Sequence, residues 1–238
     1  ASDPVSKFIS GGYYTSAPSK EQIADGYYVV ESNLAGYPYT VGDVDPSAAT
    51  IVVKSGSTGS VAESATKDLT EEEISEINTI AAKSEVNGVA EAIAGDKKDD
   101  IASAADVSED VLADSSNTIE VNVNVAVELT EISKTANEDG SESAITKLTF
   151  TAKPVATVSV NGEEKETKVD VPNSYLNGKA IEVKLPLPTG FVPKQIKHTS
   201  SNGSVEYFIN ESEGTKLGAG TFKVEDGCAV FTITHFSV

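Results

Sequence analysis

The chain has 238 residues, of which 37 are acidic and 18 are basic, and every basic residue is lysine, so the formal net charge is −19 at pH 7. Such a charge repels phosphate backbones, and without arginine no bidentate phosphate contact forms, which excludes nucleic acid and anionic membrane surfaces as partners. No apolar run reaches the length of about 18 residues that a spanning helix needs, so no membrane insertion is expected. The lack of methionine favours a mature or trimmed form of a longer product.

Residues 1–68 combine dense glycine and serine with six of the chain's eight tyrosines. Short strand-like pieces such as 27–30 and 51–53 alternate with turn residues, which predicts a β-repeat or β-helix-like piece. Gly56 and Gly59 indicate a linker near 54–68, where limited proteolysis is expected. We expect the tyrosines to stack between rungs, and the alternative is an exposed glycan-binding strip. The six residues are Tyr13, Tyr14, Tyr27, Tyr28, Tyr37 and Tyr39.

Residues 69–115 are predicted to form an acidic helical segment. The pattern Thr70-Glu71-Glu72-Glu73 is typical of a capping box, and the apolar face of the helix that it starts begins at Ile74. A second short apolar stripe occupies 86–93. The segment holds 13 acids and 3 lysines, a net charge of −10. We interpret it as a solvated outer helix face, and the alternative is a dedicated partner surface.

Residues 116–238 are predicted to be a run of strands. From Ile119 to Leu129, apolar odd-numbered residues alternate with polar or small even-numbered ones, the strongest structural signal in the chain. The turn signal at 137–140 predicts a hairpin that returns through Leu148 and Phe150. Further strands are expected near 155–160, 166–171, 180–187, 204–209, 221–224 and 229–236. The sequence thus predicts a mainly β fold with a small helical segment, ending in an Ig-like antiparallel β-sandwich.

Several pieces of the sequence resemble a known family. Phe8-Ile-Ser-Gly-Gly-Tyr-Tyr14, Ile23-Ala-Asp-Gly-Tyr27 and Tyr39-Thr-Val41 resemble a repeat of large surface proteins of gut Firmicutes, which often closes a right-handed β-helix. The helical stretch, strand 119–129, the piece 185–191, His198 and the ending 231–237 resemble the module that often follows. The resemblance implies an extracellular module, at the cell surface or in the cell wall, beside neighbouring domains of the same protein. It implies no activity.

The ending His235-Phe236-Ser237 resembles the self-cleavage site of a class of autoproteolytic domains and of a nucleoporin. In that chemistry the serine hydroxyl attacks the preceding carbonyl, the peptide shifts to an ester, and water cleaves the ester. Ser237 would be the nucleophile and His235 the base, and the bond after Phe236 would carry the strain. We interpret the motif as a plain strand end with Phe236 in the core and Ser237 at its edge, and self-cleavage is the alternative.

Metal and cofactor sites have little support in the sequence. His198, His235 and Cys228 are scattered, which does not fit the ligand spacing of a zinc site. We interpret the oxygen-rich turn that contains Asp43 and Asp45 as an ordinary turn, and the alternative is a calcium site. The glycine-rich piece 56–60 lacks the lysine of a phosphate-binding loop. We therefore expect no cofactor.

Turnover of an external substrate is not expected, because a general acid–base site most often uses histidine and a nucleophile needs an activating neighbour. Cys228 follows the turn signal Asp226-Gly227 and opens an apolar run, so we interpret it as a small core residue. The sequence therefore predicts a structural, spacer or adhesion module of a secreted bacterial cell-surface protein. The alternatives are a carbohydrate- or host-protein-binding module and a self-cleaving domain.

Overall fold

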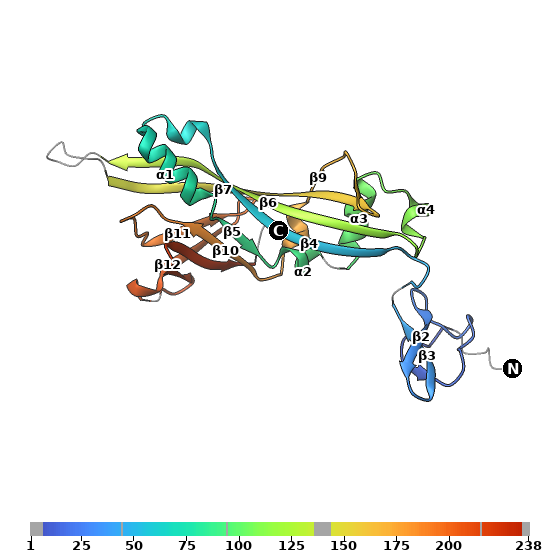
Figure 1. The fold of residues 1–238 in the computed structure, drawn as a ribbon. Coiled ribbons are helices and arrows are strands. Elements are labelled where there is room, and N and C mark those ends of the chain that lie inside the picture. Colours follow the sequence, from blue (N-terminus) through green and yellow to red (C-terminus); the bar gives the residue numbers. More distant parts are fainter. Residues whose placement is uncertain (1–6, 44, 94, 136–143, 215, 235–238) are drawn as a thin grey trace. The chain divides into compact units, whose positions relative to one another are not determined.

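The computed structural model describes residues 7–43, 45–93, 95–135, 144–214 and 216–234. The fold is mainly β with a small helical part, as the sequence predicts (Figure 1). Contacts divide the chain into two compact units. Unit 1 comprises 1–50 and 107–118, and unit 2 comprises 51–106 and 119–238. This division differs from the compositional boundaries at 68 and 115, because residues 51–106 make most of their contacts with the later strands.

Unit 1 is built around a three-stranded antiparallel sheet with the order β1–β3–β2. The strands are β1 (Tyr13–Tyr14), β2 (Tyr28–Leu34) and β3 (Tyr37–Gly42). Gly36 has a φ of 83° in the turn between β2 and β3, a conformation that favours glycine. Ile23 and Val41 are the buried apolar residues in this part of the unit. The antiparallel sheet differs from the expected β-helix-like rungs, which would pair in parallel.

Backbone hydrogen bonds join the two segments of unit 1. The amide of Ala49 donates to the carbonyl of Leu112 over 2.8 Å, and the amide of Thr50 donates to the carbonyl of Asn117 over 3.0 Å. Leu112 is the last residue of the short helix α4 (Glu109–Leu112). The segment that leaves unit 1 and the segment that returns to it are therefore held together along their backbones.

Unit 2 contains two sheets. The first has the order β4–β6–β7–β8, with β9 paired to β7, and the second has the order β11–β12–β13–β14–β10–β5. The strands of the first sheet are β4 (Thr50–Val61), β6 (Thr118–Thr135), β7 (Ala144–Val160), β8 (Glu163–Glu164) and β9 (Val169–Asp170). Those of the second are β5 (Glu85–Asn87), β10 (Ile181–Pro186), β11 (Gln195–Thr199), β12 (Val205–Asn210), β13 (Gly220–Glu225) and β14 (Cys228–Ile233).

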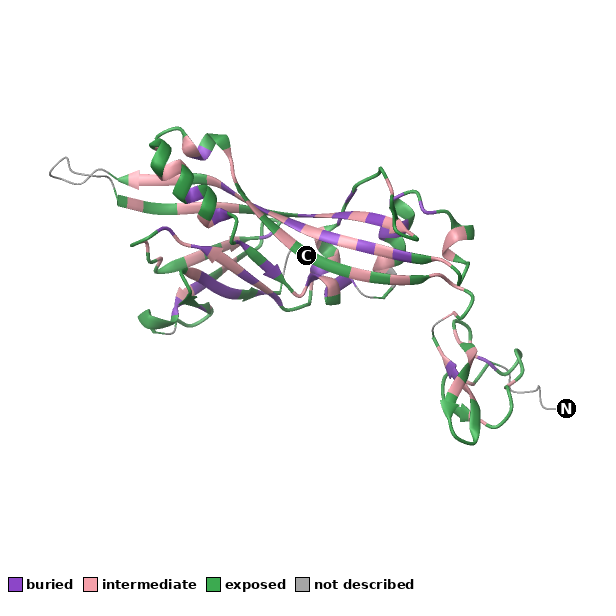
Figure 2. Ribbon diagram, in the orientation of Figure 1, coloured by how far each residue is buried: buried purple, intermediate pink, exposed green. Residues whose placement is uncertain are grey.

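The hairpin of β6 and β7 forms the long ladder of unit 2. The odd-numbered residues of β6 from Ile119 to Leu129 are each at most 3% exposed, while the even-numbered ones between them are half-buried, as Figure 2 shows in alternating colours. The predicted period-two strand and its inner face are thus confirmed. The return through Leu148 and Phe150 is also confirmed, since they pair with Ile132 and Leu129. The predicted turn at 137–140 lies outside the described residues.

Two Xaa-Gly pairs form two-residue hairpin turns, and the second of them is the predicted turn signal before Cys228. Asn161 and Gly162 have φ values of 52° and 86° between β7 and β8, and Asp226 and Gly227 have φ values of 50° and 73° between β13 and β14. Positive φ at both central residues is the requirement of a type I′ turn, and Asn-Gly and Asp-Gly are the pairs that meet it at least cost.

β4 is an edge strand of the first sheet and not the linker expected near 54–68. It reaches Val61, and the 3₁₀ helix η1 (Glu63–Thr66) follows directly. Its contacts with β6 advance in step along both strands, so the two strands run parallel. The contacts are Lys54–Glu120, Thr58–Asn124 and Ala62–Leu129. The glycines of β4 misled the sequence interpretation, because in a strand glycine also marks a close approach of another backbone.

The expected β-sandwich holds in its coarse form, but its antiparallel character fails at two ladders. β4 and β6 are parallel, and β12 and β13 are parallel through Phe208–Gly220 and Asn210–Phe222. β5 pairs with β10 from within the segment that the sequence assigns to helix. The sandwich therefore takes strands from outside 116–238. Local patterns do not reveal this, because strand partners are set by tertiary packing.

The helices of unit 2 lie between β4 and β6 in the sequence. They are α1 (Glu71–Ala81), α2 (Val89–Ile93) and α3 (Asp96–Ala104). The predicted capping box is confirmed: the amide of Glu73 donates to Oγ1 of Thr70 over 3.3 Å, and the amide of Thr70 donates to Oε2 of Glu73 over 2.8 Å. Ile77 and Ala81 form the buried face of α1. α3 lies within the predicted helical segment 69–115, although its charged first turn shows no apolar period of its own.

Lys97, a residue of α3, forms hydrogen bonds that link α3 to α2 and to the 3₁₀ helix η2 (Asn173–Leu176). Nζ of Lys97 donates to the carbonyls of Ala92, over 3.3 Å, and Tyr175, over 2.6 Å, and the Tyr175 hydroxyl donates to Asp100 over 3.0 Å. Burial, followed by the Asp100 carboxylate, raises the pKa of Tyr175. Leu176, which is fully buried, is held in the core by this arrangement.

The capping box makes a testable contribution to acid stability. Oε1 of Glu73 also accepts from Nζ of Lys134 over 2.8 Å, and this lysine together with the Thr70 amide lowers the pKa of Glu73. A lowered folded-state pKa gives stability that is present above the unfolded value and lost as pH falls through the folded value. Glu73→Gln keeps an acceptor for Thr70 but removes the ion pair, so we expect a loss of about 0.5–1 kcal/mol at pH 7.

Urea denaturation of the parent and Glu73→Gln at pH 7 and pH 3 checks this expectation. The gap in unfolding free energy between the two proteins should shrink toward pH 3. A gap that is the same at both pH values would contradict the assignment of the ion pair.

Candidate functional site

The strand register in unit 1 separates the tyrosines of the predicted glycan strip. Residues directly opposite each other in a ladder share a face. Tyr14 lies opposite Tyr39, and Tyr37 is two residues from Tyr39, so these three share one face. Tyr13 lies opposite Thr40, and Tyr28 lies opposite Gly42, two residues further, so Tyr13 and Tyr28 share the other face. Tyr27 precedes β2 and belongs to neither row.

The two faces of this sheet differ in burial. The face of Tyr14 and Tyr39 also carries the buried Val41, and the Tyr14 hydroxyl donates to the carbonyl of Gly11 over 2.6 Å. On the other face the side chains of Tyr13 and Tyr28 are 58% and 36% exposed. The structure thus leaves Tyr13 and Tyr28 exposed on one face and Tyr37 exposed on the other, in place of a row of six.

In the candidate calcium turn, the Asp45 carboxylate accepts hydrogen bonds from Ser47 of the same turn. Oδ1 of Asp45 accepts from the amide of Ser47 over 2.9 Å and from its hydroxyl over 2.7 Å. These bonds, the side-chain one first, hold the pKa of Asp45 below its usual value. Asp43 is exposed, and no group of three or more His, Cys, Asp or Glu side chains suited to a metal occurs among the described residues. Calcium binding at Asp43 and Asp45 stays a prediction.

A surface groove of about 570 Å³ lies in unit 2 between α1 and the ends of β10 and β14. One wall is a stripe of α1 at helical spacing, and the other is formed by the segment after β10 and by the β13–β14 turn. The α1 wall consists of Glu72, Ser75, Glu76, Thr79 and Ile80, and of Lys83, which follows the helix. The opposite wall consists of Pro186, Leu187, Thr189, Asp226, Gly227 and Cys228. Leu187 and Thr189, which follow β10, thus lie in this groove.

Cys228 sits in the groove and is only partly buried, in contrast to the core position that the sequence predicts. Burial, followed by the charge of Glu85, raises the pKa of its thiol. A thiol with a raised pKa is a poor nucleophile. Among the described residues, burial and the charge of Glu85 thus work against the thiolate that covalent catalysis needs.

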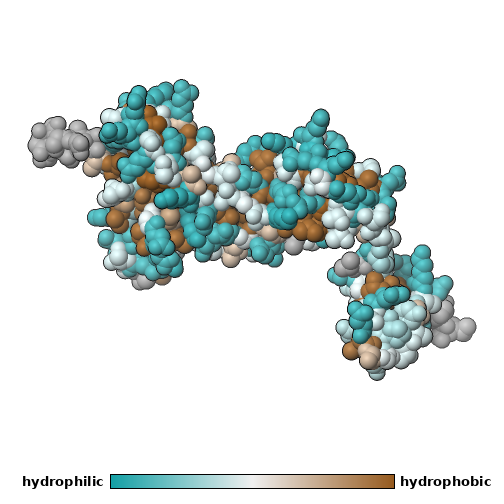
Figure 3. All heavy atoms as spheres, viewed as in Figure 1, coloured by the Kyte–Doolittle hydropathy of each residue, from teal (hydrophilic) through white to brown (hydrophobic). Residues whose placement is uncertain are grey.

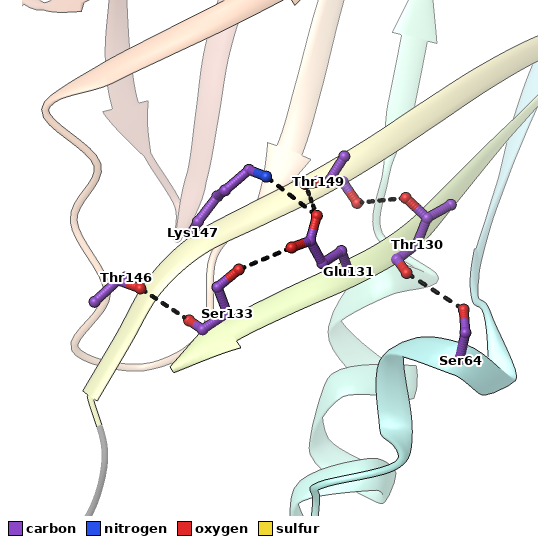
Figure 4. Close-up of polar contacts among 7 residues, drawn as sticks. All are labelled: Ser64, Thr130, Glu131, Ser133, Thr146, Lys147 and Thr149. Carbon is purple, nitrogen blue, oxygen red and sulfur yellow. Dashed lines mark hydrogen bonds and ion pairs between the residues drawn. The ribbon is translucent and has the colours of Figure 1, made fainter. Parts of the chain in front are cut away.

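The far half of the β6–β7 hairpin carries a network of polar side chains on its surface (Figure 4). The Glu131 carboxylate accepts from Lys147, Ser133 and Thr149 over 3.1, 3.0 and 3.1 Å. These partners, Lys147 first, lower the pKa of Glu131. Thr130 is the extra residue of a bulge between Leu129 and Glu131, where the register with β7 shifts.

This network fixes the bulge and does not resemble a reactive centre. The Thr130 hydroxyl donates to the carbonyl of Thr149 over 3.2 Å, and the Ser64 hydroxyl of η1 donates to the carbonyl of Thr130 over 3.4 Å. The side chains of Glu131 and Lys147 are 53% and 60% exposed. A general base and nucleophile need a pocket that orients a substrate, and this cluster lies on an open strand surface.

Of the two histidines, His198 lies among the described residues. Nδ1 of His198 lies 3.2 Å from the Glu206 carboxylate, across the ladder of β11 and β12. His235, Phe236 and Ser237 lie outside the described residues, so self-cleavage stays a prediction. If it occurs, the mass of the purified chain will show a product that ends at Phe236, and Ser237→Ala will remove that product. An intact mass for the parent chain would rule the reaction out.

Comparison with models of known protein families, with curated proteins and with solved structures finds no match. None of the helices in the described part of the chain is long and apolar enough to cross a bilayer. Hydrophilic side chains dominate the face of the molecule that Figure 3 shows, with apolar ones interspersed. Function is therefore inferred from the residues themselves. Three surfaces among the described residues are candidates for binding another molecule: the exposed tyrosine pair, the groove beside α1 and the hairpin network.

Proposed function

We propose that the chain is a structural or adhesion module of a secreted bacterial cell-surface protein, with no turnover of an external substrate. The observation that supports this most is the β6–β7 ladder, whose strands are 18 and 17 residues long. An 18-residue strand spans roughly 60 Å. Such a ladder separates the segments at its two ends by a fixed distance, which is the property that a spacer needs.

Ion pairs between charged side chains link residues of neighbouring strands along the ladder. Lys147 pairs with Glu131, and Lys153 pairs with Asp170 on the neighbouring strand. A net charge of −19 favours solubility of an exposed protein. The single cysteine and the resemblance to repeats of Firmicute surface proteins support the extracellular location.

The location is tested on intact cells of the bacterium that makes the protein. Protease treatment of unpermeabilised cells should release peptides of this chain, and an antibody against the chain should label those cells. Release only after lysis would contradict a surface location. A screen of glycans, esters and peptides should show no hydrolysis. Activity that survives repurification and is lost on mutation of one Asp, Glu or His would contradict the non-catalytic part.

A second candidate function, carbohydrate binding, is favoured by the exposed pair Tyr13 and Tyr28. Tyrosine rings stack on the apolar face of a sugar and offer a hydroxyl at their edge. Thr40 lies between the two tyrosines on the same face. An uncharged glycan avoids the repulsion that the acidic chain exerts on anionic ones.

We expect Tyr13→Ala and Tyr28→Ala each to weaken glycan binding tenfold or more, about 1.4 kcal/mol. Tyr37→Ala is the matched control, because Tyr37 is 44% exposed but lies on the opposite face. Binding to a panel of neutral plant and host polysaccharides, followed by calorimetry on any that bind, measures the effect. Equal losses in all three variants, or no binding to any glycan, would contradict this candidate.

A further inference from the structure

We propose that the groove between α1 and the β13–β14 turn binds a short extended peptide segment that carries lysine or arginine beside apolar side chains. This inference goes beyond the proposed function, since a spacer needs no ligand. The groove volume of about 570 Å³ lies within the range of roughly 300–1,000 Å³ that is usual for ligand sites.

One face of α1 packs in the core, and another face lines the groove. Its core face, with Ile77 and Ala81, is buried in unit 2. Its groove face recurs at spacings of three and four residues from Glu72 to Ile80, so it forms one stripe along the helix. Ile80 lies on that stripe and is half-buried. An apolar side chain among polar neighbours is thus presented to the groove and not to the core.

The groove combines apolar patches with acidic residues. Ile80 on one wall and Leu187 and Cys228 on the other are half-buried and provide apolar surface for a ligand's side chains. Three acids line the groove against one lysine; they are Glu72, Glu76 and Asp226, with Lys83 at one end. Glu76 is held in place by the Thr189 hydroxyl, which donates to its Oε1 over 3.3 Å.

Charge complementarity decides the class of ligand. A cationic side chain with an aliphatic stem can lay the stem on Ile80 or Leu187 and place its charge among the carboxylates. The field of the whole chain, with its net charge of −19, attracts cations and repels acidic peptides. A basic, partly apolar peptide satisfies both features of the groove, whereas a neutral glycan would leave the carboxylates without partners.

Cys228 provides a probe inside the groove, because it is the single cysteine of the chain. The full chain is treated with iodoacetamide, and the rate of alkylation is followed by intact mass. The ligand probes are acetyl-Leu-Lys-Leu-Lys-Leu-amide and the matched peptide with glutamate at both lysine positions. We expect the lysine peptide to slow alkylation several-fold and the glutamate peptide to leave the rate unchanged. Added 0.5 M NaCl, a level at which screening acts over about 4 Å, should weaken the protection.

Paired variants identify the residues responsible. Glu72→Gln with Glu76→Gln removes two charges from the groove and should abolish protection. Glu71→Gln with Glu91→Gln removes two exposed charges from α1 and α2 outside the groove and should preserve it. Leu187→Asn should weaken protection without changing the net charge. Circular dichroism of each variant checks that its fold is unchanged.

The proposal is overturned if the lysine peptide gives no protection, if the glutamate peptide protects equally, or if protection persists in the Glu72→Gln, Glu76→Gln variant. Self-association of the parent chain in sedimentation that this variant abolishes would assign the groove to a second copy, and would likewise overturn it.

Discussion

Val123→Asp should abolish the cooperative unfolding transition of unit 2. Val123 is 1% exposed in the middle of β6, opposite Ala156, which is fully buried. The substitution removes the burial of a valine, worth about 1.5–3 kcal/mol, and puts an unpaired carboxylate in its place. The expected loss of about 5 kcal/mol or more is comparable with the whole stability of an ordinary domain. Thermal melting followed by circular dichroism measures it.

Ala126→Asp is the matched control, because it introduces the same side chain into the same strand on the outer face. Ala126 is half-buried and lies opposite Lys153. A carboxylate there gains a cross-strand partner of opposite charge, worth roughly 0.2–1 kcal/mol. We expect Ala126→Asp to melt close to the parent. If Val123→Asp also melted like the parent, the assignment of the inner face of β6 would be wrong.

The features that the sequence predicted are those encoded within one segment. The strict alternation from Ile119 to Leu129, the capping box at Thr70 and the Asp226-Gly227 turn each follow from local rules about side-chain period, helix ends and positive φ. Each depends on residues close in sequence, so no knowledge of strand partners was needed. The structure confirms all three.

The features that the sequence missed depend on partners far along the chain. The parallel ladder of β4 and β6 joins residues such as Thr58 and Asn124, which are 66 positions apart. β5 is only three residues long and takes its partner from β10. Strands this short or this rich in glycine carry no period of their own, so only tertiary packing defines them.

The candidate surfaces also combine features that are encoded within one segment with features that depend on distant partners. The sequence identified the tyrosines, but their assignment to two faces follows from the pairing of β1, β2 and β3. The α1 stripe that lines the groove is visible as a helical period from Glu72 to Ile80. Its opposite wall forms only because β10 and β14 pair from Ile181–Ile233 to Pro186–Cys228, which brings Leu187 beside the β13–β14 turn. No local pattern could have joined these segments.

Gly59→Ala should strongly destabilise unit 2, although glycine-to-alanine changes in strands are usually favourable. A Cβ at position 59 would lie 1.6 Å from the carbonyl oxygen of Ala81, at the end of α1, and 3.1 Å from Oγ of Ser84. Backbone atoms cannot move aside as a flexible side chain can, so β4 or the end of α1 must shift. Overpacking of this kind costs about 1–3 kcal/mol, and the contact with backbone places the expected loss at the upper end.

Gly56→Ala, three residues earlier in the same strand, isolates the steric effect. No atom lies within 4 Å of a Cβ at position 56, and neither Gly56 nor Gly59 has a positive φ. There the loss of unfolded-state freedom should raise stability by about 0.4–1 kcal/mol. Urea denaturation of both variants therefore should shift the midpoint in opposite directions. Equal, small shifts would mean that residues 54–61 behave as the flexible linker that their composition suggests, and that β4 does not pack against α1.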